Sequence, residues 1–348
     1  MIYYFHSFPK FSRQIEYTFR NIFCILKVNA KRIDSLDYDF DKNDIVVIYT
    51  DKTISLETKY ISIMNSKSLF GEHYGSKEVM DNISVLKKSE FVSLFREPGT
   101  KEIHNFYGEN CVQSNMDLIA DIFFTLTRYE EYEAVMHSVR DEFKRYRIEN
   151  SILFKNDLIR RPIVDEQIEL LKKMLIYLDY KIVFRNGAYL FVSHDIDSLR
   201  KYHNFYTVRT DLLNKIVWGK FTSFLSLLIK ILCARKDPYF NIISIIKKEK
   251  KIKINSSFYF MHNKSKNNAD YNFESKRIQK LIREMNRYNV EMGYHVSIDE
   301  NIREMKKHVS NHNKSVELEY GAREHYLQVN PPLPILSSPK VLLFRAFL

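Results

Sequence analysis

LFVSHDIDSLRK, residues 190–201, is the stretch that decides the fold of the second half of this chain. Its first residues, LFV, form an apolar run that is typical of a buried strand. The polar side chains of His194, Asp195 and Asp197 follow directly. Two carboxylates one residue apart repel each other unless a cation lies between them or one carboxyl keeps its proton. The stretch therefore predicts a strand with a charged site at its end.

Strand and helix patterns alternate downstream of this stretch. Two further apolar runs, 254–261 and 290–297, are typical of strands. Helical periodicity is found over 221–233, 237–252, 273–289 and 299–314. Asp237 and Pro238 stand where the second of these helices would have its cap and first turn. Such alternation implies parallel strands with helical crossovers, hence an α/β sheet or barrel, whose chemistry gathers at the C-terminal ends of the strands.

The first half contains similar elements in a less regular order. We expect a short buried strand over 44–50 and helices over 11–26, 114–135 and 161–178. Ser114 or Asn115 can cap the middle helix. The last helix is expected to begin through Pro162 and to end near Tyr177.

The dipeptide Asn186-Gly187 is a strong signal for a β-hairpin between these halves. We place a domain boundary near residue 180. Residues 1–180 are then expected to form a smaller α+β domain of unknown function, and residues 181–348 an α/β domain. A chain of 348 residues suits two domains of ordinary size.

The chain is basic, with 54 Lys and Arg against 43 Asp and Glu and a formal charge of +11. This charge allows an anionic partner, either nucleic acid or an acidic glycan. The lysines are scattered and form no patch interleaved with aromatic residues, so we expect no specific nucleic-acid partner. A general bias of the composition explains the charge more simply.

Three widely spaced cysteines, Cys24, Cys111 and Cys233, fit reduced thiols rather than a disulfide framework. The N-terminal residues lack the features of a signal peptide. The most apolar later run is interrupted by Lys230 and is shorter than the roughly 20 residues of a membrane span. The sequence therefore predicts a cytoplasmic protein without a membrane span, and it leaves the oligomeric state open.

Polar side chains with metal-ligand chemistry collect at the predicted strand ends. They are His194, Asp195, Asp197, His262, His295, Ser297, Asp299, Arg323 and His325. Carboxylate and imidazole together bind divalent metal ions, zinc first among them, although such a mixed set suits several metals. In an Asp-x-Asp pair one carboxylate can bind the metal while the other takes a proton from water. A metal ion would supply the cation that the two acids require.

Four motifs carry a resemblance to a known family. FVSHDIDS, FYFM, MGYHVS and AREHYL, in this order, resemble the polysaccharide deacetylases, the NodB-like domain of carbohydrate esterase family 4. The upstream segments DLIADIFFTLTRYEEY and RPIVDEQ resemble the uncharacterised domain that often precedes this one. The resemblance extends to about residue 332. It implies a NodB-like (β/α) barrel and a hydrolase that removes N-acetyl groups from a sugar in a polysaccharide or glycan precursor.

The resemblance also implies a role for individual residues. Asp195 stands at the position of the catalytic base, and Asp197 and His295 at positions of metal ligands. Asp299 stands where the family has a second histidine, so it is either a ligand or a helix cap; His325 is the other candidate for the third ligand. Arg323 matches the arginine that orients the base. The remaining histidines are then expected beside the site, as His194, or on the surface, as His262, His308 and His312.

The resemblance ends at the segment LPILSSPKVLLFRAFL, residues 333–348. We expect that this segment replaces the last part of the barrel, so that the barrel is incomplete. An open sheet edge and a missing general acid would follow. The alternative function is therefore a truncated, non-catalytic relative, either a glycan-binding remnant or a pseudogene product. A nucleic-acid-binding protein, suggested only by the charge, is the third reading.

Overall fold

The computed structural model describes residues 1–96, 102–131, 141, 145–182, 190–202, 205–218, 221–232, 237–262, 264, 269–296 and 322–324. Contacts divide the chain into two units, one within residues 1–186 and one within residues 187–329. The predicted hairpin at Asn186-Gly187 and the predicted helix over 299–314 lie outside the described residues. The two units are described separately below.

The N-terminal unit is built on a six-stranded sheet with the order β2-β1-β3-β4-β8-β7. Its strands are β1 (Ile2–His6), β2 (Ala30–Arg32), β3 (Ile45–Thr50), β4 (Lys59–Met64), β7 (Asn105–Tyr107) and β8 (Cys111–Ser114). All neighbouring strands are parallel except β7 and β8. The expected α+β arrangement is therefore wrong for this unit: helical crossovers make the pairing parallel, and the unit is of the α/β class.

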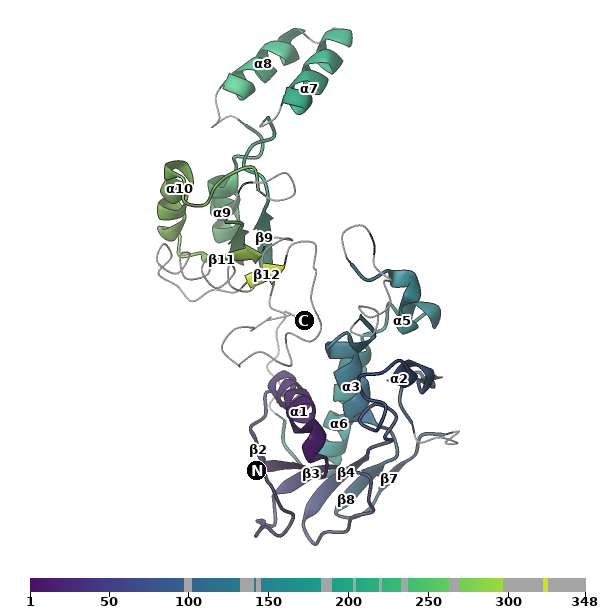
Figure 1. Cartoon of the computed structure of the whole chain (residues 1–348). Helices are drawn as coiled ribbons and strands as arrows, with labels where there is room; N and C mark the ends of the chain where they lie inside the picture. The colour runs from purple at the N-terminus through teal and green to yellow at the C-terminus, as the bar shows by residue number, and fades with distance from the viewer. Residues whose placement is uncertain are drawn as a thin grey trace. The chain divides into compact units, whose positions relative to one another are not determined.

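Three helices cover one face of this sheet, as Figure 1 shows: α1 (Ser12–Leu26), α3 (Leu118–Leu126) and α6 (Ile163–Tyr177). Alternate strand residues such as Tyr4, Val47 and Ile61 pack against them. The residues between these, Tyr3 and Val46 among them, form a second cluster on the opposite face. Because both faces are covered, β3 is buried at every position, which explains its uninterrupted apolar sequence.

The helices expected over 11–26 and 161–178 and the expected central strand are present, whereas the helix expected over 114–135 is shorter: α3 begins at Leu118 and ends at Leu126, where a turn follows. Asp117, not Ser114 or Asn115, caps α3, and its carboxylate accepts a hydrogen bond from the backbone N–H of Ala120. Pro162 precedes the first residue of α6, as expected, and the helix ends at Tyr177. Apolar periodicity predicts where a helix lies in the sequence. It does not predict the cap as well, because several Ser, Asn and Asp residues before the helix can each act as the cap.

Short elements connect these parts of the N-terminal unit. They are η1 (Pro9–Phe11), α2 (Glu78–Asp81), β5 (Leu86–Lys87), β6 (Val92–Ser93), η2 (Ile148–Asn150) and α5 (Ile152–Lys155). β5 and β6 form a small antiparallel pair of their own.

The second unit contains a four-stranded parallel sheet with the order β12-β11-β10-β9. Its strands are β9 (Phe191–Ile196), β10 (Asn255–Phe260), β11 (Glu291–Val296) and β12 (Ala322–Glu324). Its helices are α7 (Phe205–Val217), α8 (Phe221–Leu232), α9 (Ile242–Lys251) and α10 (Lys276–Asn286). The parallel α/β architecture predicted for this half is confirmed.

Asp237 does not cap α9, contrary to the prediction. Asn241 precedes that helix, and the buried carboxylate of Asp237 instead accepts hydrogen bonds from the backbone N–H groups of Lys201 and Tyr202. A carboxylate accepts hydrogen bonds from whichever backbone N–H groups lie close to it in space. For Asp237 these groups belong to a loop that is distant in sequence, not to the helix that follows.

The two faces of the second sheet differ in chemistry because side chains alternate along each strand. On one face Ile196, Phe258, Phe260 and Met292 join the core formed with α9 and α10. Asp195, one residue before Ile196, therefore belongs to the other, polar face. Among the described residues, no helix is both long and apolar enough to cross a membrane.

Candidate functional site

The pairing register brings the predicted site residues together across the sheet. Asp195 of β9 stands opposite Tyr259 of β10. His295 of β11 stands opposite Arg323 of β12. All four residues belong to the polar face, so four strands of this sheet each contribute a chemically active side chain.

Arg323 crosses the sheet to reach Asp195. Its Nη1 donates a hydrogen bond to Oδ1 of Asp195 at 2.9 Å, and its Nη2 donates to Oγ of Ser193 at 2.6 Å. The guanidinium group also lies over the ring of Tyr259, 4.8 Å from the ring centroid. A planar, forked donor stacked on an aromatic ring has little freedom to rotate, so Arg323 fixes the orientation of the Asp195 carboxylate.

His295 links Arg323 to the second acid. Its Nδ1 lies 2.9 Å from the backbone oxygen of Arg323, and its Nε2 lies 3.3 Å from Oδ1 of Asp197. A carbonyl oxygen can only accept, so Nδ1 must carry a proton. In the neutral imidazole, Nε2 then presents a lone pair towards a carboxylate oxygen. Two acceptors at this distance require a proton or a cation between them.

The Asp197–His295 pair fits a divalent metal ion. Metal–ligand bonds of about 2.1 Å in a tetrahedral site place neighbouring ligand atoms about 3.4 Å apart. The Oδ1–Nε2 distance is 3.3 Å. Metal-binding histidines commonly donate their other ring N–H to a backbone carbonyl, as Nδ1 of His295 does here.

The two sequence candidates for a third metal ligand, Asp299 and His325, fall outside the part of the chain that the structure describes. Among the described residues, no group of three His, Cys, Asp or Glu side chains is arranged to hold a metal ion. The described part of the site therefore consists of two pairs: Asp197 with His295, whose side chains are of the kinds that bind metal ions, and Arg323 with Asp195.

Burial differs sharply within the site. The His295 side chain is 2% exposed, whereas the Asp197 side chain is 50% exposed. The imidazole is thus held in place by packing, and the carboxylate faces solvent. Burial raises the pKa of the neighbouring Tyr259, and the carboxylate of Glu291 adds to this rise while Arg323 opposes it. Tyr259 therefore remains a neutral hydroxyl near neutral pH.

Asp270, which had no predicted role, holds the loop after β9. The carboxylate of Asp270 accepts hydrogen bonds from the backbone N–H groups of Leu199 and Arg200, both at 2.9 Å. Its own N–H donates to the backbone oxygen of Asp197 at 3.3 Å. These bonds position the backbone that carries Asp197. An acid in a loop between a strand and a helix gave no signal, because its partners lie 70 residues away or more.

Tyr271 joins the ends of β9 and β10. Its hydroxyl donates to the backbone oxygen of Ile196 and accepts from the backbone N–H of Met261. Burial raises the pKa of Tyr271 well above its ordinary value, so it acts only as a neutral bridge. Ser193, another residue that was missed, could have been found from strand periodicity, because 193, 195 and 197 share one face.

Two other strand-end histidines belong to the packing of the unit. His194 lies on the covered face, where its ring stacks on Phe258 with centroids 4.6 Å apart and Nε2 lies 2.8 Å from Oε1 of Glu249. His262 is buried, 3.6 Å from the Glu274 carboxylate, so its predicted place on the surface is wrong. His308 and His312 lie outside the described residues.

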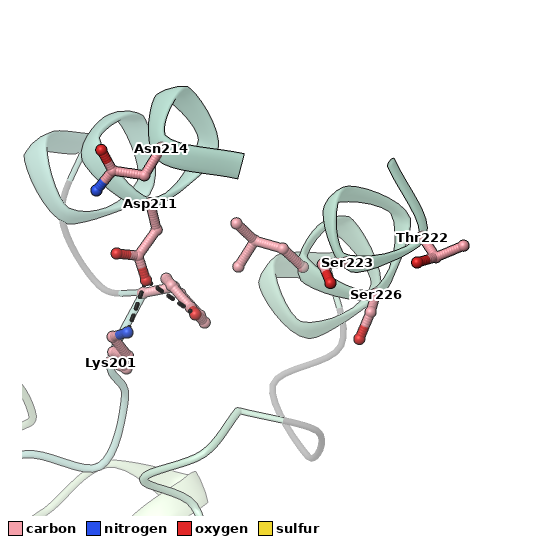
Figure 2. A pocket seen from close by; sticks show the side chains of 8 residues that line it. Lys201, Asp211, Asn214, Thr222, Ser223 and Ser226 are labelled. Carbon is pink, nitrogen blue, oxygen red and sulfur yellow. Dashed lines mark hydrogen bonds and ion pairs between the residues drawn. The ribbon is translucent and has the colours of Figure 1, made fainter. Parts of the chain in front are cut away.

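A polar pocket of about 470 Å³ lies between α7 and α8. Its lining residues are Lys201, Tyr202, Asp211, Asn214, Thr222, Ser223, Ser226 and Leu227. Figure 2 shows Asp211 extending from α7 towards Lys201, whose Nζ lies 2.6 Å from Oδ2 of Asp211. None of the predicted site residues is part of this lining, so the pocket and the Asp–His–Arg cluster are separate features of the unit.

The N-terminal unit contains two fully buried acids, Asp117 and Asp121, one turn apart in α3. Asp117 accepts hydrogen bonds from the Tyr49 hydroxyl at 2.7 Å and from the backbone N–H and hydroxyl of Ser66, both at 2.8 Å. Asp121 accepts from two backbone N–H groups and from Gln167. Burial raises the pKa of Asp117 to about 6 and that of Asp121 well above its ordinary value. Through these bonds the two carboxylates tie the backbone at Ser66, Leu94 and Phe95 to α3.

Comparison with models of protein families identifies the N-terminal unit. A family model described as a family of unknown function (DUF7033) matches residues 4–179, which are the N-terminal unit almost from end to end and half of the whole chain. No curated protein matches the chain, and no solved structure does. The chain therefore belongs to the family of unknown function DUF7033.

Proposed function

We propose that the second unit is a metal-dependent hydrolase of the polysaccharide deacetylase type. It removes the acetyl group from an N-acetylated sugar in a polysaccharide or glycan precursor, and its sheet is part of a NodB-like (β/α) barrel. The motifs FVSHDIDS, FYFM, MGYHVS and AREHYL suggest this class. The proposal rests on them together with the arrangement of the side chains that they contain.

One observation carries the proposal: Nε2 of His295 faces Oδ1 of Asp197 at 3.3 Å while Nδ1 faces a backbone oxygen. Two facing acceptors favour a bound cation, and Asp197 and His295 would hold a divalent metal ion, zinc first among them. Asp299 or His325 would complete the ligand set. When bound, such an ion activates water and polarises the carbonyl of an amide substrate.

Asp195 is suited to the role of general base. Oδ1 accepts a hydrogen bond from Arg323, which holds the carboxylate in place for the proposed proton transfer. The Asp195 side chain is 34% exposed, so water reaches it. Positioned proton transfer of this kind contributes about 10²–10⁴-fold to a rate. Arg323 is a positioning residue, since it acts through Asp195.

The polar face around the site suits a hydroxyl-rich substrate. Tyr259 lies on this face, but its side chain is buried and the Arg323 guanidinium lies over its ring. Ser257 shares the face, and its hydroxyl donates to the Glu291 carboxylate at 2.9 Å. The partly exposed carboxylates of Asp195 and Asp197 are the groups that can accept hydrogen bonds from the hydroxyls of a sugar.

The first test is the metal content of the purified chain, measured by elemental analysis. We expect about one divalent ion per chain in the wild type and its loss in both Asp197→Ala and His295→Ala. Asp34→Ala, which removes an exposed acid of the N-terminal unit, is the matched control and should keep the metal. Absence of metal from the wild type as well would favour the alternative, a non-catalytic relative.

The second test is release of acetate from N-acetylated oligosaccharides. Asp195→Asn should keep the metal and lose about 10²-fold or more of the rate, because it keeps the shape of the base and removes its proton affinity. Equal loss of metal and rate in this variant would mean that Asp195 is a ligand rather than the base.

A further inference from the structure

The paired helices α7 and α8 expose an unusual number of large apolar side chains. Leu213, Ile216, Val217, Trp218, Leu225 and Ile229 are each between 47% and 78% exposed. We call these six residues the apolar face of α7–α8. Figure 1 shows the two helices side by side. So many large apolar side chains exposed on two neighbouring helices indicate an interaction site.

Helical spacing places these residues on common faces. Leu213, Ile216 and Val217 are three and four residues apart in α7, and Trp218 follows the last residue of that helix. Leu225 and Ile229 are four residues apart in α8. Leu227, by contrast, is 1% exposed and points to the opposite side of α8. The described residues of α8 thus include one buried apolar side chain, Leu227, whereas those of α7 are all partly or fully exposed.

The charge of the same segment limits what can cover this face. Residues 205–232 contain four Lys and Arg and a single acid, Asp211. That acid already lies 2.6 Å from Lys201. A second copy of the chain would bring the same positive charges together, which is unfavourable. An anionic surface would neutralise them.

The residue types and lengths favour a lipid surface. Apolar side chains, an interfacial tryptophan and basic residues on one short segment are the features of helices that lie in the headgroup region of a membrane. α7 has 13 residues and α8 has 12, so neither reaches the roughly 20 residues of a membrane span.

We propose that the α7–α8 pair docks on the surface of an anionic lipid membrane, with Trp218 and its apolar neighbours inserted among the headgroups. The lipid contact is independent of the metal site, and its test does not depend on hydrolysis. It would hold the second unit at the bilayer, where lipid-linked glycans are found.

Trp218 is the only tryptophan of the chain, so intrinsic fluorescence reports this face alone. The full chain is mixed with vesicles of phosphatidylcholine and phosphatidylglycerol in equal parts, and with vesicles of phosphatidylcholine alone. We expect a blue shift of the emission and co-sedimentation with the anionic vesicles. Both should weaken as salt is added, because part of the attraction is electrostatic.

The double variant Ile216→Asp/Val217→Asp should lower the partition into anionic vesicles by about tenfold or more, since two inserted apolar side chains become charged. Ile159→Asp, at a similarly exposed apolar position of the N-terminal unit, is the matched control and should bind as the wild type does. Equal binding to neutral vesicles, or no binding to either kind, would overturn the proposal. So would a blue shift without vesicles that grows with protein concentration, which would identify a second copy as the occupant.

Discussion

At the scale of single residues, His295 and Arg323 determine each other's orientation. The imidazole contacts the backbone of Arg323, while the side chain of Arg323 contacts Asp195 and Ser193. A change at either residue is therefore expected to reach both acids of the site. The expected losses differ. A change at His295 should lower metal binding, because His295 faces the proposed ligand Asp197. A change at Arg323 should lower the rate, because Arg323 faces the proposed base Asp195.

Replacing Arg323 with lysine should affect rate more than binding. A lysine ammonium cannot donate to Asp195 and Ser193 in the planar, forked geometry of a guanidinium. We expect kcat for acetate release to fall by about 10²-fold, as for a misplaced catalytic group, with KM and metal content nearly unchanged. Arg283→Lys, at an exposed position of α10, is the control. Loss of metal from Arg323→Lys would instead show that the backbone contact to His295 has been disturbed.

The buried Asp117 predicts a pH-dependent stability of the N-terminal unit. Burial raises its pKa from 3.8 to about 6, so between these values the folded state binds the proton more tightly than the unfolded state. The free energy of unfolding should therefore fall as pH rises from about 4 to about 6, by about 3 kcal/mol from this group, and Asp121, whose pKa is also raised, adds to the fall.

Denaturant titration at several pH values measures this effect. Asp117→Asn should be less stable overall, because its amide faces the N–H of Ser66 and the hydroxyl of Tyr49, and it should lose the part of the decline between pH 4 and 6 that comes from Asp117. An unchanged decline in the variant would assign the titration to Asp121, whose pKa burial also raises.

At the scale of elements, the ends of β9 and β10 are joined through one hydroxyl. Tyr271 bonds to the backbone at Ile196 and at Met261 in the core of the second unit. Parallel strands are not linked by short hairpins, so such side-chain bridges help to fix where their ends stand. The bridge lies one residue from Asp197 along the chain.

Tyr271→Phe removes this hydroxyl, so that the carbonyl of Ile196 and the N–H of Met261 lose their hydrogen-bond partner. We expect the second unit to lose about 1–3 kcal/mol of unfolding free energy. Tyr239→Phe, at a half-exposed position of the same unit, should change stability little and serves as control. A loss of equal size in both variants would mean that the bridge contributes no more than an ordinary surface hydroxyl.

At the scale of the whole molecule, a bound metal should stabilise only the unit that holds it. A ligand present at 100 times its dissociation constant adds about 2.7 kcal/mol to the unit that binds it. Adding a chelator should therefore speed amide hydrogen exchange in β9 and β11 by up to about 100-fold and leave β3 unchanged.

Hydrogen exchange followed by mass spectrometry resolves the two units in one experiment. The Asp197→Ala variant is the control, and its exchange should not respond to the chelator. Equal acceleration in β3 and β9 would contradict the assignment of the metal to the second unit.

The sequence alone located part of the elements of each half, and of the six strands of the N-terminal sheet it predicted only the central β3. Apolar periodicity located β3, β9, β10 and β11, because burial of one or both faces imposes a pattern that local sequence must carry. Alternation of strands and helices also predicted parallel pairing in the second unit. Caps were less predictable: Asp117 and Asn241 precede α3 and α9, where other residues had been expected, since neighbouring polar residues differ little in capping strength.

Only the tertiary structure decided how the site is assembled. That Arg323 reaches Asp195, 128 residues away, follows from the strand order β12-β11-β10-β9 and its register. The approach of Nε2 of His295 to the Asp197 carboxylate, and the hydrogen bonds by which Asp270 holds the loop after β9, likewise depend on contacts between distant segments. Sequence periodicity specifies which side of a strand is buried, but strand order and register arise from packing of the whole sheet.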